Sequence, residues 1–157
     1  MNACLFLCAA TADDVAVMVD LDRRCCSHPW TNDHFAGAVR DREHTLVLAL
    51  RSHMAADRAG SIVGHCVVQV VADEAHIHTL AIDTDLRRRG LGRWLLSQTL
   101  ALARKRGARR ALLEVREGNS AAKGLYSSTG FFAVGRRRAY YAQPTEDALL
   151  LEKALER

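Results

Sequence analysis

The fold is decided by one stretch of the chain, Leu80-Ala81-Ile82-Asp83-Thr84-Asp85-Leu86-Arg87-Arg88-Arg89-Gly90-Leu91-Gly92-Arg93. Its apolar start is typical of a strand, and a basic turn then opens into an amphipathic segment that Gly107 ends. The first turn of a helix leaves backbone N–H groups without partners, and the helix dipole adds partial positive charge there. The stretch therefore predicts a strand–turn–helix unit. Because Gly90 and Gly92 have no side chain to keep an anion away, we expect the turn to bind phosphate.

The glycine spacing of this turn is Arg-x-x-Gly-x-Gly, from Arg87 to Gly92. It differs from the Gly-x-Gly-x-x-Gly of dinucleotide-binding folds and lacks the Gly-Lys-Ser/Thr end of a nucleotide P-loop. The alternative is a helix start with a solvated basic turn, since short glycine motifs also match by accident. The strand before the turn and the helix after it favour the phosphate site.

The rest of the chain predicts strands and helices on both sides of this unit. Before it we expect a strand within 1–10, a helix from Thr11 to about Arg24, and a second helix capped by Thr31. Strands at 45–50 and 62–71 would form a hairpin joined by a long loop, from Arg51 to Gly60, and a third strand covers 75–83. After it come a helix at 90–106, a strand at 109–116, a helix at 120–128 and strands at 131–138 and 146–154. This order predicts a mixed α/β sheet flanked by helices, in a single domain over residues 1–157.

Composition limits the function classes. The 157 residues are 49% hydrophobic and 25% charged, with a net charge of +4, which suits a globular nucleic-acid binder or an enzyme with a polyanionic cofactor. Five cysteines, without zinc-type CxxC pairs, favour reduced thiols in a cytoplasmic protein. No segment is long and apolar enough to predict a membrane span. His76 and His78 share a strand face but have no evident third ligand, so we expect no metal.

The turn resembles the signature Gln/Arg-x-x-Gly-x-Gly/Ala of the Gcn5-related N-acetyltransferase (GNAT) superfamily. Within it, the chain from about residue 28 to 153 is similar to the ribosomal-protein-alanine N-acetyltransferases, in His28-Pro29-Trp30-Thr31, Leu113-Glu114-Val115-Arg116, Asn119, Leu125-Tyr126 and Arg137-Arg138-x-Tyr140-Tyr141. The resemblance implies a mostly antiparallel sheet with one splayed parallel pair. It also implies acetyl-CoA as co-substrate and the N-terminal peptide of a small-subunit ribosomal protein as acceptor, with direct transfer and no specific nucleic acid. Thr84 departs from the family, which commonly has proline there.

The resemblance also assigns site residues. It makes Glu114 the general base and Tyr126 the general acid, and it implies contacts with the cofactor by Leu80, Ala81, Ile82, Arg88, Arg89, Gly90, Leu91, Gly92, Arg93 and Asn119. A backbone N–H of the strand at 77–83 could also polarise the thioester carbonyl. From the residues alone, Glu114 could equally form a structural ion pair with Arg116, and Tyr126 could be a packing residue. Asn119 could serve as a helix N-cap while also contacting the cofactor.

Other functions compete with this interpretation. Arg136-Arg137-Arg138 with Tyr140-Tyr141 could be a nucleic-acid patch, although a strand end leading into a substrate loop is favoured because the cluster is short. Glu146 and Asp147 could attract a basic acceptor peptide. A GNAT enzyme for another protein or a small amine is the first rival. A non-catalytic acyl-CoA or RNA-binding module is the second.

Overall fold

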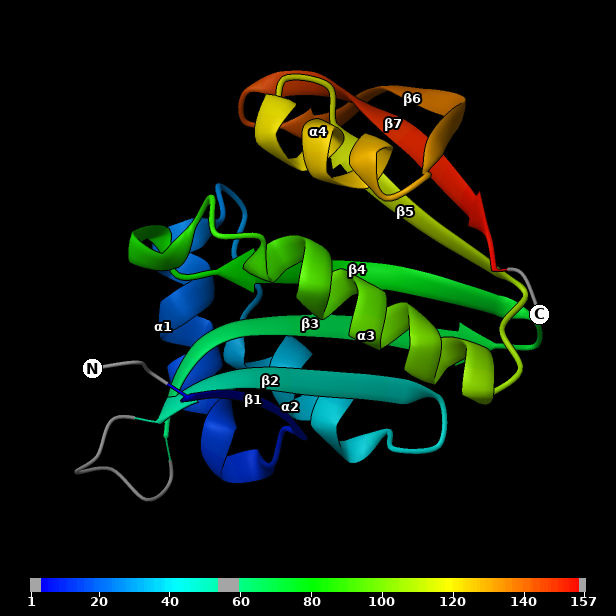
Figure 1. Ribbon diagram of the computed structural model, residues 1–157. Helices are drawn as coiled ribbons and strands as arrows, with labels where there is room; N and C mark the ends of the chain where they lie inside the picture. Colours follow the sequence, from blue (N-terminus) through cyan, green and yellow to red (C-terminus); the bar gives the residue numbers. More distant parts are fainter. Residues whose placement is uncertain (1–3, 54–59, 156–157) are drawn as a thin grey trace.

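The computed structural model describes residues 4–53 and 60–155. They form one seven-stranded sheet in the order β1-β2-β3-β4-β5-β7-β6 (Figure 1). The strands are β1 (Cys4–Ala9), β2 (Thr45–His53), β3 (Ser61–Val71), β4 (Glu74–Ile82), β5 (Arg110–Arg116), β6 (Phe132–Ala142) and β7 (Thr145–Ala154). Neighbouring strands are antiparallel except for β4 and β5, which are parallel. The predicted mixed sheet is therefore confirmed.

Within the described residues, four α-helices flank the sheet. They are α1 (Val15–Cys25), which follows the 3-10 turn η1 (Ala12–Asp14), α2 (Asn32–Arg40), α3 (Leu91–Lys105) and α4 (Ser120–Ser128). The expected caps are present: Thr11 forms a capping box with Asp14, and the Thr31 hydroxyl accepts from the N–H of His34 at 3.4 Å. Helix α1 has already ended at Cys25, and Pro29 lies in the segment between α1 and α2.

Each face of the sheet has its own apolar core. On one face, α3 and α4 contribute Leu95, Leu96 and Tyr126 to a cluster that also contains Leu113 and Val115 of β5. On the other face, α1 and α2 pack Met18, Leu21 and Phe35 against β2 and β3. Figure 1 shows α3 in front of the sheet and α1 behind it. The helices of the two faces therefore enclose the middle of the sheet from both sides.

The parallel pair separates halfway along its length. Register between β4 and β5 runs only from Glu74↔Arg110 to Ile77↔Leu113, and beyond it the two strands diverge (Figure 1). The β3–β4 register also shifts there, because Val67 faces Thr79 whereas Val68 faces Ile77. His78 is thus an extra residue, a β-bulge that redirects the end of β4. The splayed pair expected from the resemblance is present.

Two predicted boundaries are wrong. Residues 51–53 belong to β2 and not to a loop, because they pair with β1 as far as Cys4↔His53. The rest of the predicted loop, 54–59, lies outside the described residues, as do residues 1–3 of the predicted first strand. Strand β6 continues to Ala142, four residues beyond the predicted end, through a register shift at which Ala139 has a φ of 49°.

Candidate functional site

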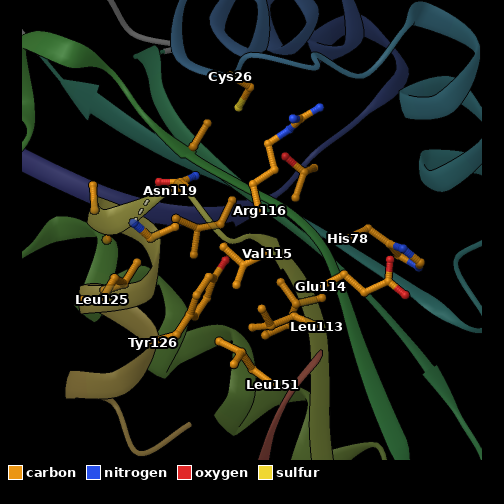
Figure 2. Close-up of a pocket in the computed structure, with 18 of the residues that line it drawn as sticks. Cys26, His78, Leu113, Glu114, Val115, Arg116, Asn119, Leu125, Tyr126 and Leu151 are labelled. Carbon is orange, nitrogen blue, oxygen red and sulfur yellow. Dashed lines mark hydrogen bonds between the residues drawn. The ribbon is translucent and has the colours of Figure 1, made fainter. Parts of the chain in front are cut away.

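A groove of about 1280 Å³ lies where β4 and β5 separate (Figure 2). Its walls come from residues 25–30, the ends of β4 and β5, the basic turn and the start of α3, one side of α4, and strands β6 and β7. Beyond Leu113, the edge of β5 that faces β4 is no longer paired with it, so the groove reaches both faces of the sheet. Side chains from both faces of the sheet can therefore contribute to one site.

The basic turn forms the part of the groove that can bind an anion. Gly90 has a φ of 79°, a left-handed conformation, and is the N-cap of α3, so the first amides of that helix emerge at the groove. A Cβ at Gly90 would meet no atom within 4 Å, so the space above the turn is open. Exposed Arg88 and Arg93 flank these amides. This combination of helix dipole, amides and arginines fits a diphosphate.

Most of the residues predicted to bind the cofactor are brought together here. Those that line the groove are Leu80, Ala81, Ile82, Arg88, Gly90, Leu91, Gly92, Arg93 and Asn119. Arg89 does not line it, and its guanidinium reaches back to the carbonyl of Asp85 at 3.4 Å. Arg87, the first residue of the predicted phosphate-binding motif, also fastens the turn, because it donates to the carbonyls of Ile82 at 3.3 Å and Cys25 at 3.1 Å.

The end of β4 presents backbone groups to the groove. The N–H of Asp83 donates to Val63 of β3 at 2.8 Å, and backbone direction alternates along a strand. The backbone groups of Ala81 therefore face β3, whereas those of Leu80 and Ile82 face the gap left by β5. The carbonyl of Ile82 accepts from Arg87 and from the Cys25 thiol. Leu80 thus offers an N–H and a carbonyl to a molecule lying in the groove.

Glu114 and Tyr126 reach the groove from opposite faces of the sheet. Along β5, Leu113 and Val115 are buried toward α3 and α4, so Glu114 and Arg116 point to the face of α1. Tyr126 comes from α4 on the other face (Figure 2). The free edge of β5 therefore separates a carboxylate from a phenol, an arrangement that suits a reaction with one proton transfer on each side.

The partner of Glu114 is not the one considered from the sequence. The side chain is 29% exposed and its Oε1 lies 3.1 Å from Nε of Arg137 on β6. Ala148 of β7 stands in register between Arg116 and Arg137, and its small side chain leaves room for Arg137 to cross β7. Arg116 pairs with another acid, so the proposed Glu114–Arg116 ion pair is wrong.

Tyr126 is both a packing residue and a groove residue. It is 8% exposed and meets Phe131 edge to face, with ring centroids 5.5 Å apart. Burial raises its pKa well above the ordinary value of 10, so its hydroxyl stays protonated at neutral pH. Figure 2 shows the ring rising from α4 toward Val115. The neutral phenol can therefore act as a hydrogen-bond donor inside the groove.

Asn119 is confirmed as an N-cap. Its Oδ1 accepts from the N–H of Ala122 at 3.1 Å, at the start of α4. The residue also lines the groove. Its amide N–H₂ is not used by the cap and can donate to a bound molecule.

The wall beside Glu114 contains residues to which sequence reasoning assigned no chemistry. Arg116 donates to Glu146 at 2.9 Å, contacts the His28 ring at 2.8 Å, and lies over the ring of Tyr141 at 3.9 Å. Trp30 packs its ring near Phe35 at 5.2 Å and near His78 at 5.8 Å. The available signals were the resemblances at 28–31, 113–116 and 137–141, and they could not give the contacts themselves, which join segments far apart in the sequence.

The charged groups around this wall are mostly paired. Arg136 bridges Glu117 at 2.6 Å and Asp147 at 2.9 Å. Arg116 and Arg136 already pair with Glu146 and Asp147, which weakens the attraction that these acids could exert on a basic peptide, and this expectation stays a prediction. Within the basic cluster at 136–138, Arg136 and Arg137 are both paired with acids of this chain, which disfavours a nucleic-acid patch.

The two histidines of β4 have separate partners. His76 Nε2 lies 2.8 Å from Glu74 Oε2, and His78 Nε2 lies 3.4 Å from Gln69 Oε1. Desolvation, with a contribution from His76, lowers the pKa of His78. Across residues 4–53 and 60–155, no three histidine, cysteine or acidic side chains gather as metal ligands. In the same part of the chain, no helix is long and apolar enough to cross a membrane.

Comparison with known proteins places the chain. The model of the acetyltransferase (GNAT) family matches residues 15–131. The ribosomal protein bS18-alanine N-acetyltransferase of Salmonella typhimurium is 37% identical over 140 residues, which cover 88% of this chain and 89% of that protein. The N-alpha-acetyltransferase RimI of Mycobacterium tuberculosis is 35% identical over 126 residues, which cover 78% and 77%.

A solved structure agrees with these relatives. The crystal structure of the ribosomal-protein-S18-alanine N-acetyltransferase from Escherichia coli matches with a TM-score of 0.85 at 31% identity, covering 98% of this chain and 96% of that chain. The family match spans more than half of the chain, and both relatives align with most of it. The chain therefore belongs to the GNAT family of acetyltransferases, in the branch that contains the RimI enzymes.

Proposed function

We propose that this acetyl-CoA-dependent N-acetyltransferase acetylates the N-terminal alanine of ribosomal protein bS18. The observation that carries the proposal is the groove at the β4–β5 separation, which combines an anion site on one face with the carboxylate of Glu114 on the other. The acceptor is taken from the relatives that act on bS18 and align with most of this chain.

The residues around the turn suit the co-substrate. The amides at the start of α3, with Arg88 and Arg93, would hold the pyrophosphate, and Leu80 and Asn119 would bind the arm that leads to the thioester. Acetyl-CoA supplies an activated acetyl group when bound. The N–H of Leu80 offers a donor at the place where negative charge develops during acyl transfer.

The chain's own groups handle the protons. Glu114 accepts the proton of the acceptor ammonium, directly or through one water molecule. On the opposite side of β5, Tyr126 holds a proton on its phenol oxygen. It can donate this proton to the departing thiolate. Nothing in this pair requires a covalent enzyme intermediate, which agrees with direct transfer in a ternary complex.

An α-amino group is the acceptor best matched to a carboxylate base. Its reference pKa is about 8, against about 10.4 for lysine, so far more of it is already neutral at physiological pH. The wall formed by Trp30, His28 and Tyr141 stands on the side of Glu114, where an acceptor would enter. This site therefore favours N-terminal amines over lysine side chains.

Mass spectrometry of bS18 after incubation with enzyme and acetyl-CoA tests the proposal. We expect one added acetyl group, on the α-amine of the substrate's N-terminal alanine. A synthetic bS18 peptide whose N-terminal alanine is already acetylated serves as the control and should gain none, although its lysines remain free. Faster acetylation of a polyamine or another small amine than of the bS18 peptide would overturn the proposed acceptor.

A further inference from the structure

Asp22 is a fully buried carboxylate with no role in the site described above. It lies on α1, and its side chain is 1% exposed. Burying a carboxylate is unfavourable unless hydrogen bonds or charges compensate for it. Asp22 has four such contacts: two with residues 26–30, one with β3 and one with β4. This concentration of contacts on one carboxylate calls for a functional explanation.

Two of the contacts fix the segment of residues 26–30 at both of its ends. At the start, the Cys26 N–H donates to the Asp22 carbonyl at 2.8 Å and the Cys26 thiol lies 3.3 Å from Oδ1. At the end, the Trp30 N–H donates to Oδ2 at 2.6 Å. His28, which contacts Arg116, stands between them. One carboxylate thus sets the path of the segment that carries both His28 and Trp30.

The other two contacts join this segment to the sheet. The Thr79 hydroxyl donates to Oδ1 at 3.3 Å, and Nε2 of His65 lies 3.1 Å from the same oxygen. Thr79 directly follows His78, the bulge residue that turns β4 away from β5. Oδ2 therefore holds the segment, whereas Oδ1 holds β3 and β4 behind it. His65 itself is fully buried against the ring of Phe35.

The contacts keep Asp22 ionised. Burial raises the pKa of a carboxyl, but His65 and the Trp30 N–H outweigh this effect and hold the pKa of Asp22 below its ordinary value. The groups that face it are His65 of β3, Thr79 of β4, Cys26 and the Trp30 N–H. An ionised carboxylate gives stronger hydrogen bonds than a neutral side chain would. The segment is therefore held more tightly than an ordinary surface loop.

We propose that Asp22 is a positioning residue for the acceptor, which holds residues 26–30 and the end of β4 in the arrangement that places the acceptor amine beside Glu114. This inference rests on one part of the proposed function, namely that the acceptor binds beside the wall formed by His28 and Trp30. Asp22 contacts neither the anion-binding turn nor Tyr126. Its loss should therefore weaken acceptor binding far more than the binding of acetyl-CoA, because the pyrophosphate site at the start of α3 does not depend on Asp22.

The test compares Asp22→Asn with Asp14→Asn. Asp14 is the matched control, because it is also a buried acid beside α1, paired with Arg51 on the far side from the groove. We expect Asp22→Asn to raise the KM for the acceptor by about tenfold, with the KM for acetyl-CoA changed by less than about twofold. Asp14→Asn should lower the melting temperature without changing either KM.

A second variant keeps the test decisive if Asp22→Asn does not fold. Thr79→Val removes one bond to Oδ1 and leaves the buried charge in place, and we expect a rise of about threefold in the acceptor KM. Equal changes in both KM values, or an Asp22→Asn profile that matches Asp14→Asn, would mean a structural role only. Both KM values, for the acceptor and for acetyl-CoA, are measured with whichever N-terminal peptide the enzyme acetylates. A failure of bS18 as the substrate would therefore not be mistaken for a failure of the role proposed for Asp22.

Discussion

Replacement of Tyr126 by phenylalanine separates its two roles. The ring is 8% exposed and packs against Phe131, and phenylalanine keeps that contact. Within the described residues the hydroxyl has no protein hydrogen-bond partner, so its removal leaves no buried group unsatisfied. We therefore expect the free energy of unfolding at pH 7.5 to change by less than about 1 kcal/mol. A loss of activity would then come from the missing proton donor.

The expected loss of activity follows from the pKa of the phenol. General acid catalysis typically contributes about 10²–10⁴-fold. Burial raises the pKa of Tyr126 above 10, whereas a free thiol has a pKa of about 8.5, so the proton moves against an unfavourable pKa difference. We therefore expect the lower end of that range, about 100-fold in kcat, which corresponds to about 2.7 kcal/mol.

The assay is steady-state release of free CoA with an alanine-starting peptide, with thermal unfolding measured in parallel. Tyr126→Phe should lose activity and keep its melting temperature. Solvent viscosity should leave the wild-type kcat unchanged, which establishes that the chemical step is limiting. If the variant then keeps more than half of the wild-type kcat, Tyr126 is not the general acid.

The same variant has a distinct response to alkaline pH. The pKa of Tyr126 is raised on folding, so the neutral phenol stabilises the fold at full strength below the unfolded pKa of about 10, and this contribution is lost as pH rises further. Above pH 10 the wild type should lose up to about 1.4 kcal/mol per pH unit from this residue alone. Urea midpoints at pH 8 and pH 10.5 should therefore fall less in Tyr126→Phe, and equal falls would contradict the burial effect.

Three further changes test other parts of the site. Glu114→Gln should lower kcat by about 10²–10³-fold while the KM for acetyl-CoA stays constant, because glutamine keeps an oxygen for Arg137; a wild-type rate would exclude Glu114 as the base. Gly90→Ala should weaken CoA binding by about tenfold in calorimetry, because a left-handed φ costs a non-glycine residue about 1–2 kcal/mol and the new methyl group would enter the space proposed for the diphosphate; a Cβ there meets no protein atom within 4 Å, so a clash inside the protein is not the cause. Cys26 should resist alkylation at pH 8 in the folded protein while exposed Cys4 reacts, because burial and Asp22 raise the pKa of the Cys26 thiol to about 12; rapid modification of Cys26 in peptide mapping would contradict this burial.

The sequence predicted correctly those elements whose ends are set by residues close in the chain. The limits of α4 agree with the expected 120–128, because its cap, Asn119, and its terminating Gly130 are both neighbours in sequence. The end of β2 was missed because residues 51–53 become a strand by pairing with β1, more than forty positions away, and residues 51 and 52 also pair with β3. Arg137 was missed as the partner of Glu114 for the same reason, since it reaches across β7.

The two halves of the groove differ in how far sequence can reveal them. The anion-binding half is one continuous stretch, from Leu80 to Arg93, so its chemistry can be inferred before its fold is known. The half beside Glu114 is assembled from residues 26–30, β4, β5 and β6, which only the sheet brings together. Substitutions in this second half leave the α3 N-terminus and its amides untouched. A GNAT chain can therefore change its acceptor without losing acetyl-CoA, and the acceptor of this chain is decided by the wall that Asp22 holds in place.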